Sequence, residues 1–212
     1  NTDLEGDGAF ICQNSWGDNF GENGFFYISY YDTNIGTHNV VYTDIENTDN
    51  YDHIYQSDLC GWVGQLGYNK DSIYGANVFT AEGNETLKAA SFYATGKDSQ
   101  YELYVVRQFE DETSLEKMIP VASGKLGNAG YYTVDFNQGI EVDAGERYAV
   151  VLYIITPGSV HPMAIEYAAD EATENVDLDD GESYISANGS KWVSVDTVEK
   201  SNLCIKAFSD NR

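Results

Sequence analysis

Hydrophobic positions along the chain fall in short runs, which Gly, Asn and Asp residues interrupt. Short apolar runs rich in Tyr, Phe, Val and Ile and bounded by turn-forming residues are typical of β-strands. The pattern therefore predicts many short strands joined by tight turns. The predicted strands are Ala9–Gln13, Gly24–Tyr31, Asn39–Tyr42, Ala76–Thr80, Leu87–Ala94, Tyr101–Arg107, Tyr131–Phe136, Tyr148–Ile155, Met163–Tyr167, Ser183–Ser186 and Leu203–Phe208.

One predicted strand, Tyr148–Ile155, is apolar on both faces. Such a strand is covered on both sides, so we expect it near the centre of a sheet. Helical patterns are confined to Glu110–Met118 and Asp170–Glu174, and neither segment is long enough to form a layer. The predicted fold class is therefore all-β, with a β-sandwich architecture.

A polar, turn-forming stretch, Glu46–Asn50, separates two aromatic segments and predicts a domain boundary. We place the boundary at residue 46, which divides the chain into residues 1–45 and 46–212. The second segment carries enough strands to enclose a core, whereas the first carries too few to do so alone. The first segment is therefore expected to belong to a larger domain.

The balance of charges excludes several classes of partner. The chain has 212 residues, with 35 Asp and Glu against 11 Lys and Arg, and a formal net charge of −24. A field of this sign repels phosphate backbones and anionic lipid surfaces, so we expect no nucleic acid partner. The apolar runs are too short to cross a bilayer, so we expect a soluble protein without membrane insertion.

Acidic residues without compensating bases also favour a bound cation. The densest local cluster is Asp177–Glu182, in which Asp177 and Asp179 are the candidate metal ligands. Calcium is the expected ion because it prefers carboxylate and carbonyl oxygens. The cluster departs by one residue from the helix–loop–helix calcium pattern, and the alternative is a solvated acidic loop.

The most specific motif is Asn14-Ser15-Trp16-Gly17, followed by a Gly-rich loop (residues 21–24) and an aromatic strand. This arrangement resembles the asparagine segment of the papain-like cysteine proteases. The resemblance implies that Asn14 accepts a hydrogen bond from the catalytic His and fixes the orientation of its imidazole. It also implies that the indole of Trp16 shields this hydrogen bond from water. Peptide hydrolysis of this kind needs no cofactor.

The resemblance leaves two catalytic groups unassigned, because the family's nucleophilic Cys and catalytic His come before this asparagine. The expected partner is therefore an upstream part of the peptidase domain, and we expect this chain alone to be inactive. Cys12 is interpreted as a core residue, and all three cysteines are expected to be buried free thiols. His38, His53 and His161 follow the asparagine and are expected on the surface or in loops.

The rest of the chain resembles the lectin-like domain that follows the protease domain in clostridial cell-surface cysteine proteases. The segments that carry this resemblance are Tyr51–Asp58, Gly61-Trp62, Ala76–Phe79 and Asn202–Phe208. It implies a jelly-roll-like, lectin-like sandwich, an extracellular location at the cell surface or cell wall, and a protein substrate such as a surface-layer precursor.

Two alternatives to a peptidase follow from the same residues. The first is a surface module that binds carbohydrate or protein without catalysis, with Trp62 and Trp192 as candidate sugar-binding residues and a cell-wall glycan as the partner. Packing of both indoles between the sheets is the competing interpretation. The second is a rigid spacer stabilised by calcium.

Overall fold

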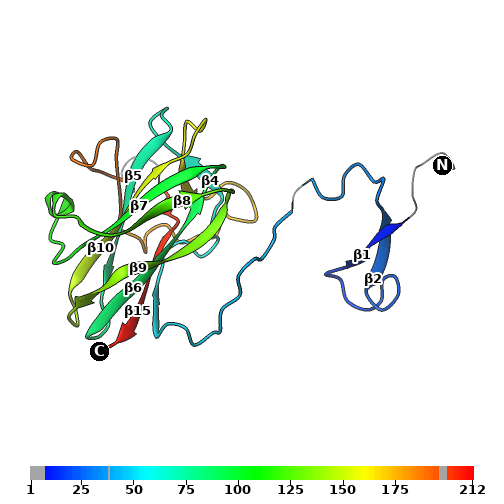
Figure 1. Ribbon diagram of the computed structural model, residues 1–212, viewed down its shortest axis with the longest axis horizontal. Coiled ribbons are helices and arrows are strands. Elements are labelled where there is room, and N and C mark those ends of the chain that lie inside the picture. The colour runs from blue at the N-terminus through cyan, green and yellow to red at the C-terminus, as the bar shows by residue number, and fades with distance from the viewer. Residues whose placement is uncertain (1–7, 38, 196–199) are drawn as a thin grey trace. The chain divides into compact units, whose positions relative to one another are not determined.

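The computed structural model describes residues 8–37, 39–195 and 200–212 (Figure 1). Contacts divide the chain into two compact units, Asn1–Asn47 and Thr48–Arg212, and each is described below by itself. Within the described ranges, no helix combines the length and the apolar character that a membrane crossing requires.

The first unit contains one β-hairpin. Its strands β1 (Ala9–Gln13) and β2 (Phe25–Ser29) pair antiparallel, and Gln13 lies opposite Phe25 at the end of the ladder nearest the connecting loop. The structure confirms the predicted first strand and shortens the second. The predicted strand Asn39–Tyr42 is wrong, because these residues pair with no other strand among the described residues.

The second unit is a β-sandwich, which confirms the predicted all-β fold class. Its elements are β3 (His53–Tyr55), β4 (Gly64–Leu66), β5 (Ser72–Thr80), β6 (Glu85–Ala94), β7 (Ser99–Val106), η1 (Glu112–Glu116), β8 (Ile119–Leu126), β9 (Gly130–Val142), β10 (Arg147–Ile155), β11 (Met163–Glu166), β12 (Ser183–Ser186), β13 (Val193–Ser194), β14 (Asn202–Leu203) and β15 (Ile205–Asn211). A six-stranded sheet has the order β13-β12-β5-β10-β7-β8, and a four-stranded sheet has the order β3-β15-β6-β9. A smaller sheet has the order β14-β11-β4.

The main core lies between the two larger sheets. On β10, Tyr148, Val150, Leu152 and Ile154 are buried in a cluster that includes Phe92 from β6 and other residues of both sheets. The strand directions and layers can be followed in Figure 1, where β5, β7 and β10 form one layer and β6, β9 and β15 the other. Burial of these large side chains removes apolar surface from water and is the main stabilising contribution to this unit.

The opposite face of β10 is also buried. Ala149 and Val151 belong to a second cluster that includes Phe109 and Leu115 from the β7–β8 connection. The 3₁₀-helix η1 holds Leu115 in place, and Asp111 caps this helix by accepting a hydrogen bond from the Thr113 main-chain N–H at 3.0 Å. The prediction that this strand is covered on both faces is therefore confirmed.

Two predicted helices differ from the structure. Glu110–Met118 contains only the short η1, and Asp170–Glu174 forms a turn, so the second prediction is wrong. In that turn the main-chain N–H groups of Ala172 and Thr173 both donate to the Asp170 carboxylate. A side chain that binds nearby main-chain groups in this way competes with helical hydrogen bonding.

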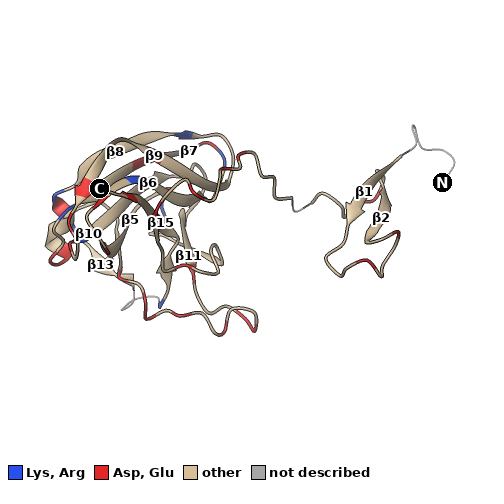
Figure 2. Ribbon diagram, turned by 90° about the horizontal axis from the view of Figure 1, so that it is seen from below, with Lys and Arg blue, Asp and Glu red and all other residues tan. Residues whose placement is uncertain are grey.

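Acidic residues are spread over the loops of both units, whereas Lys and Arg occur in the second unit and are absent from the first 69 residues of the sequence (Figure 2). One of the described ion pairs is buried: Lys206 Nζ lies 2.8 Å from Asp58 Oδ1. Burial raises the pKa of Asp58, and the neighbouring Lys206 ammonium opposes this rise.

A buried amide joins the two halves of the sandwich. Asn77 on β5 donates through Nδ2 to the carbonyls of Leu203 (2.9 Å) and Ile205 (2.8 Å), and its Oδ1 accepts from Ser183 Oγ at 2.8 Å. All the hydrogen-bonding groups of this side chain are satisfied inside the protein, which makes a buried amide stabilising.

We expect Asn77→Ala to lower the free energy of unfolding by about 2–4 kcal/mol, because two buried carbonyls lose their donor. Urea denaturation followed by circular dichroism measures this change. Asn137→Ala, at an exposed position of β9, is the matched control and should change stability by no more than about 0.5 kcal/mol. Equal stability of the two variants would contradict the structural role of Asn77.

Candidate functional site

Asn14 directly follows β1, where the hairpin loop begins. Its main-chain N–H donates to the Gly24 carbonyl at 2.9 Å, which extends the hairpin by one hydrogen bond beyond Gln13. The loop turns back through Gly21, whose φ is +68°. A Cβ at Gly21 would lie 2.1 Å from the Phe25 carbonyl oxygen, so this turn requires glycine.

The side-chain amide of Asn14 is held by the loop. Its Oδ1 accepts a hydrogen bond from the Trp16 main-chain N–H at 2.6 Å, and its Nδ2 donates to the Phe20 carbonyl at 3.4 Å. An amide oxygen has two lone pairs, so Oδ1 can accept a further hydrogen bond. Asn14 also lines an open pocket of about 330 Å³ together with Gln13, Ser15, Trp16 and Phe26.

Trp16 lies beside Asn14 with its indole 76% exposed. The indole makes an edge contact with Phe20 at a centroid distance of 5.3 Å, and Phe20 makes a similar contact with Phe26 at 5.5 Å. These contacts hold the indole at the rim of the pocket that Asn14 lines. The structure therefore brings together the two residues that the sequence predicted as catalytic.

The hairpin exposes an unusual amount of apolar surface. Its exposed large apolar side chains are Phe10, Ile11, Trp16, Phe20, Phe25, Tyr27, Tyr30 and Tyr31. An isolated two-stranded hairpin is marginally stable in water, and exposed apolar side chains on such an element favour packing against another protein segment.

The structure also shows the surroundings of the three cysteines and of two of the histidines. Cys12 is partly exposed on β1 rather than a core residue, and Cys60 is exposed, so the prediction of burial is wrong for both; Cys204 is buried as predicted. His53 lies on β3 and His161 in the loop before β11. His38 lies outside the described residues.

The two other predicted tryptophans do not form one site. Trp62 is 37% exposed and contacts Tyr93 at a centroid distance of 5.8 Å. Trp192 is partly buried against the second cluster, and its ring centroid lies 6.2 Å from that of Tyr74 in an edge-to-face contact. Its indole N–H is buried, and none of the residues that the structure describes accepts a hydrogen bond from it.

The predicted metal ligands lie in the loop between β11 and β12. Asp177 and Asp179 are neighbours there, and the Asp179 main-chain N–H donates to Asp177 Oδ1 at 3.0 Å. Within the described ranges, no three side chains of His, Cys, Asp or Glu converge in a way that could hold a metal ion.

A different set of oxygens converges on Asn202, which is fully buried. Four oxygens surround its Nδ2: the Ser57 carbonyl at 2.9 Å, Glu166 Oε2 at 3.0 Å, the Asp177 carbonyl at 2.9 Å and Asp180 Oδ1 at 3.3 Å. We call these four oxygens with Asn202 the oxygen cage. An amide nitrogen carries only two hydrogens, so it cannot satisfy four acceptors fully.

The other atom of this amide is also unusual, since Asn202 Oδ1 is buried and no hydrogen-bond partner for it lies among the described residues. A half-turn of the amide would exchange the two atoms and place Oδ1 among the four oxygens. The cage would then hold five oxygens, which suits a hard cation such as Ca²⁺. Glu166 is fixed independently, because its Oε1 accepts from the Cys60 main-chain N–H at 2.5 Å.

The acidic cluster singled out from the sequence contributes the Asp177 carbonyl and the Asp180 carboxylate to the oxygen cage, whereas sequence reasoning missed Ser57, Glu166 and Asn202. Ser57 and Asp177 contribute main-chain carbonyls, which leave no mark in the sequence. The signals that could have been used are the acidic residue that ends the apolar strand β11 and the Asn that begins the apolar segment of β14. A charged or amide side chain next to an apolar strand is buried only where hydrogen-bond or ionic partners surround it, so it indicates a polar cluster inside the protein.

The family-model comparison gives the class of protein. Residues 54–209 match the model of the lectin-like domain family. The chain therefore belongs to the lectin-like domain family. No sequence among the curated proteins matches the chain.

Solved structures give the more particular similarity. A structure of the clostridial cysteine protease Cwp84 after propeptide cleavage is 25% identical over 96% of this chain, with a TM-score of 0.79. A second structure, of the cysteine protease and lectin-like domains of Cwp84, a surface-layer-associated protein of Clostridium difficile, is 22% identical over 96% of this chain, with a TM-score of 0.74. The second likeness shows the fold alone. The chain covers 52% and 46% of these two structures, about half of their length.

Proposed function

We propose that residues 8–37 complete a papain-like peptidase domain whose nucleophilic Cys and catalytic His lie upstream of residue 1. In this proposal Asn14 is a positioning residue: its Oδ1 accepts a hydrogen bond from the imidazole and keeps the ring facing the thiolate. Trp16 covers this hydrogen bond. The chain by itself, without the nucleophile, is inactive.

The observation that carries this proposal is the partly exposed Asn14 amide, which lines a pocket on an apolar hairpin. Oδ1 has a further lone pair that can accept a hydrogen bond, and large apolar side chains of the hairpin are exposed. Both features suit a surface that docks against another part of a domain. The likeness to the Cwp84 protease structure, at 25% identity over nearly the whole chain, supports the same interpretation.

We further propose that the sandwich, residues 48–212, is an accessory domain of this peptidase at the cell surface or cell wall. Cwp84 is a surface-layer-associated protein, and the similarity to it supports this location. A surface-layer precursor or another wall protein is the proposed substrate. A surface-binding module without catalysis remains the rival function, and the peptidase test below separates the two.

We expect Asn14→Ala to lower kcat about 10- to 100-fold in the longer polypeptide that includes the upstream peptidase part. Loss of the acceptor destabilises the imidazolium, so the imidazole pKa falls and the alkaline limb of the pH–rate profile moves to lower pH. Hydrolysis of fluorescently labelled casein across pH 5–10 measures both effects.

The matched control is Asn19→Ala, at an exposed position of the same loop. It should leave both the rate and the pH profile unchanged. A longer polypeptide without thiol-dependent peptidase activity, or an Asn14→Ala variant that behaves like Asn19→Ala, would refute the proposed role.

We also propose that the oxygen cage holds a structural Ca²⁺ ion. Glu166, Asp180 and Asn202 would supply side-chain oxygens, and Ser57 and Asp177 main-chain carbonyls. Calcium–oxygen distances of about 2.4 Å place neighbouring ligands roughly 3 Å apart, which is close to the 2.9–3.3 Å between the Asn202 amide atom and the four oxygens. The ion would tie the loop that contains Ser57, the β11–β12 loop and β14 together.

Calcium should therefore raise the melting temperature of the chain by several degrees relative to EDTA, because it binds the folded state only. We expect Asp180→Asn to lose more than half of this rise, since one anionic ligand is removed. Asp179→Asn, the neighbouring carboxylate outside the cage, should keep it. Differential scanning calorimetry with and without 5 mM CaCl₂ makes the comparison. A wild-type chain that is indifferent to calcium, or one in which Asp179→Asn abolishes the rise, would overturn this assignment.

A further inference from the structure

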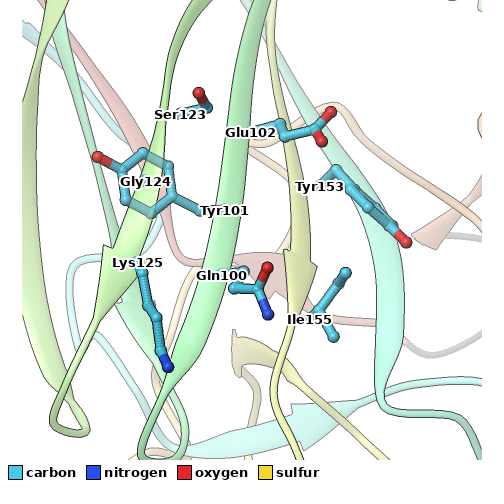
Figure 3. A pocket seen from close by; sticks show the side chains of 8 residues that line it. All are labelled: Gln100, Tyr101, Glu102, Ser123, Gly124, Lys125, Tyr153 and Ile155. Atoms are coloured by element: carbon cyan, nitrogen blue, oxygen red, sulfur yellow. The ribbon is translucent and has the colours of Figure 1, made fainter.

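The outer face of the six-stranded sheet carries an open pocket of about 400 Å³, which lies in the range of small-ligand sites. Its lining includes Gln100 and Glu102 from β7, Ser123 and Lys125 from β8, and Tyr153 and Ile155 from β10 (Figure 3). This pocket is separate from the Asn14 pocket and from the oxygen cage, since it shares no residue with either.

Strand register arranges these residues in two neighbouring rows across the sheet. In the first row Tyr153 lies opposite Tyr74 on one side and Glu102 on the other, and Glu102 lies opposite Ser123. In the second row Ile155 lies opposite Gln100, which lies opposite Lys125. Positions two residues apart on a strand share a face, so both rows point outward.

The second cluster covers this face of the sheet only as far as the row of residues before the pocket. That row contains Val151, which lies opposite Tyr104 and is buried in the second cluster. Beyond it, Tyr153 and Ile155 are only partly buried and Gln100, Glu102 and Lys125 are exposed. The pocket therefore lies where the apolar cover stops and the strands become open to solvent.

Tyr153, which lines the pocket, belongs to an aromatic stack. The rings of Tyr153 and Tyr74 stack at a centroid distance of 4.2 Å and an interplanar angle of 22°, and Trp192 makes an edge-to-face contact with Tyr74. The stacking contact with Tyr74 already orders the Tyr153 ring, so binding of a ligand to this ring costs little side-chain conformational entropy. Rigid aromatic rings of this kind bind the apolar C–H faces of sugar rings.

Polar groups next to the stack offer both donors and acceptors. The Glu102 carboxylate accepts a hydrogen bond from the Tyr104 hydroxyl, and Gln100 and Ser123 add an amide and a hydroxyl. Lys125 pairs with Asp98 at 3.1 Å, so its ammonium is already partly neutralised. The lining has one carboxylate and one ammonium and is close to neutral.

We propose that this pocket binds an uncharged saccharide, with Tyr153 as the stacking residue and Glu102, Gln100 and Ser123 as hydrogen-bond partners for its hydroxyl groups. The net charge of −24 opposes an anionic glycan. A sugar hydroxyl both donates and accepts, so it matches the mixed lining better than a purely cationic or anionic ligand. The inference is independent of the peptidase and calcium proposals.

The test titrates the full 212-residue chain with maltotriose, cellotriose and N,N′,N″-triacetylchitotriose and follows binding by calorimetry and saturation-transfer NMR. We expect at least one trisaccharide to bind with a dissociation constant on the order of 0.1–1 mM. Tyr153→Ala should weaken this binding about 10-fold or more, and Glu102→Gln about 5-fold.

Trp62→Ala and Glu171→Gln are the controls, because both residues lie outside the pocket lining. They should bind the sugar like the wild type. Glu102→Gln changes an exposed side chain, so it keeps the test valid if Tyr153→Ala fails to fold. Absence of binding up to 10 mM, binding that survives both pocket variants, loss of binding in Trp62→Ala, or preference for an anionic heparin tetrasaccharide would each overturn the proposal.

Discussion

The sandwich depends on the burial of β10 on both faces. One face contributes Tyr148, Val150, Leu152 and Ile154 to the core between the sheets, and the other contributes Ala149 and Val151 to the second cluster. Because the two faces are covered by different elements, β10 fixes the positions of the opposite sheet and of the η1 connection at once. The Asn77 amide then adds directional hydrogen bonds to a contact that would otherwise be only apolar.

The hairpin of the first unit lacks such burial, and this contrast bears on its proposed role. Within it, the Asn14–Trp16 and Asn14–Phe20 hydrogen bonds order the loop locally, while large apolar side chains remain in contact with water. A segment of this kind gains most of its stability from whatever it packs against. In the proposed peptidase, docking would therefore complete the core and place the asparagine beside the histidine in one event.

Predictions from the sequence succeeded where the pattern was local. Burial of Tyr148–Ile155 on both faces and the strand before Asn14 could be predicted from residues adjacent in the sequence, and the structure confirms both predictions. The oxygen cage as a whole was not predicted, because Ser57, Glu166 and Asn202 are far apart in the sequence and two of its oxygens belong to the main chain. Asn39–Tyr42 failed for a related reason: an apolar segment forms a strand only where a partner strand is available.

The loop that carries Ser57 also determines the behaviour of a surface thiol. Cys60 is exposed, and its main-chain N–H is held by Glu166. Desolvation of the sulfur and the nearby carboxylate of Glu166 raise the pKa of Cys60 above its ordinary value. A raised pKa lowers the fraction of thiolate at any given pH, and only the thiolate reacts quickly with oxidants or disulfides. Although it is exposed, Cys60 is therefore a poorer partner for crosslinking to a neighbouring molecule than an ordinary surface thiol.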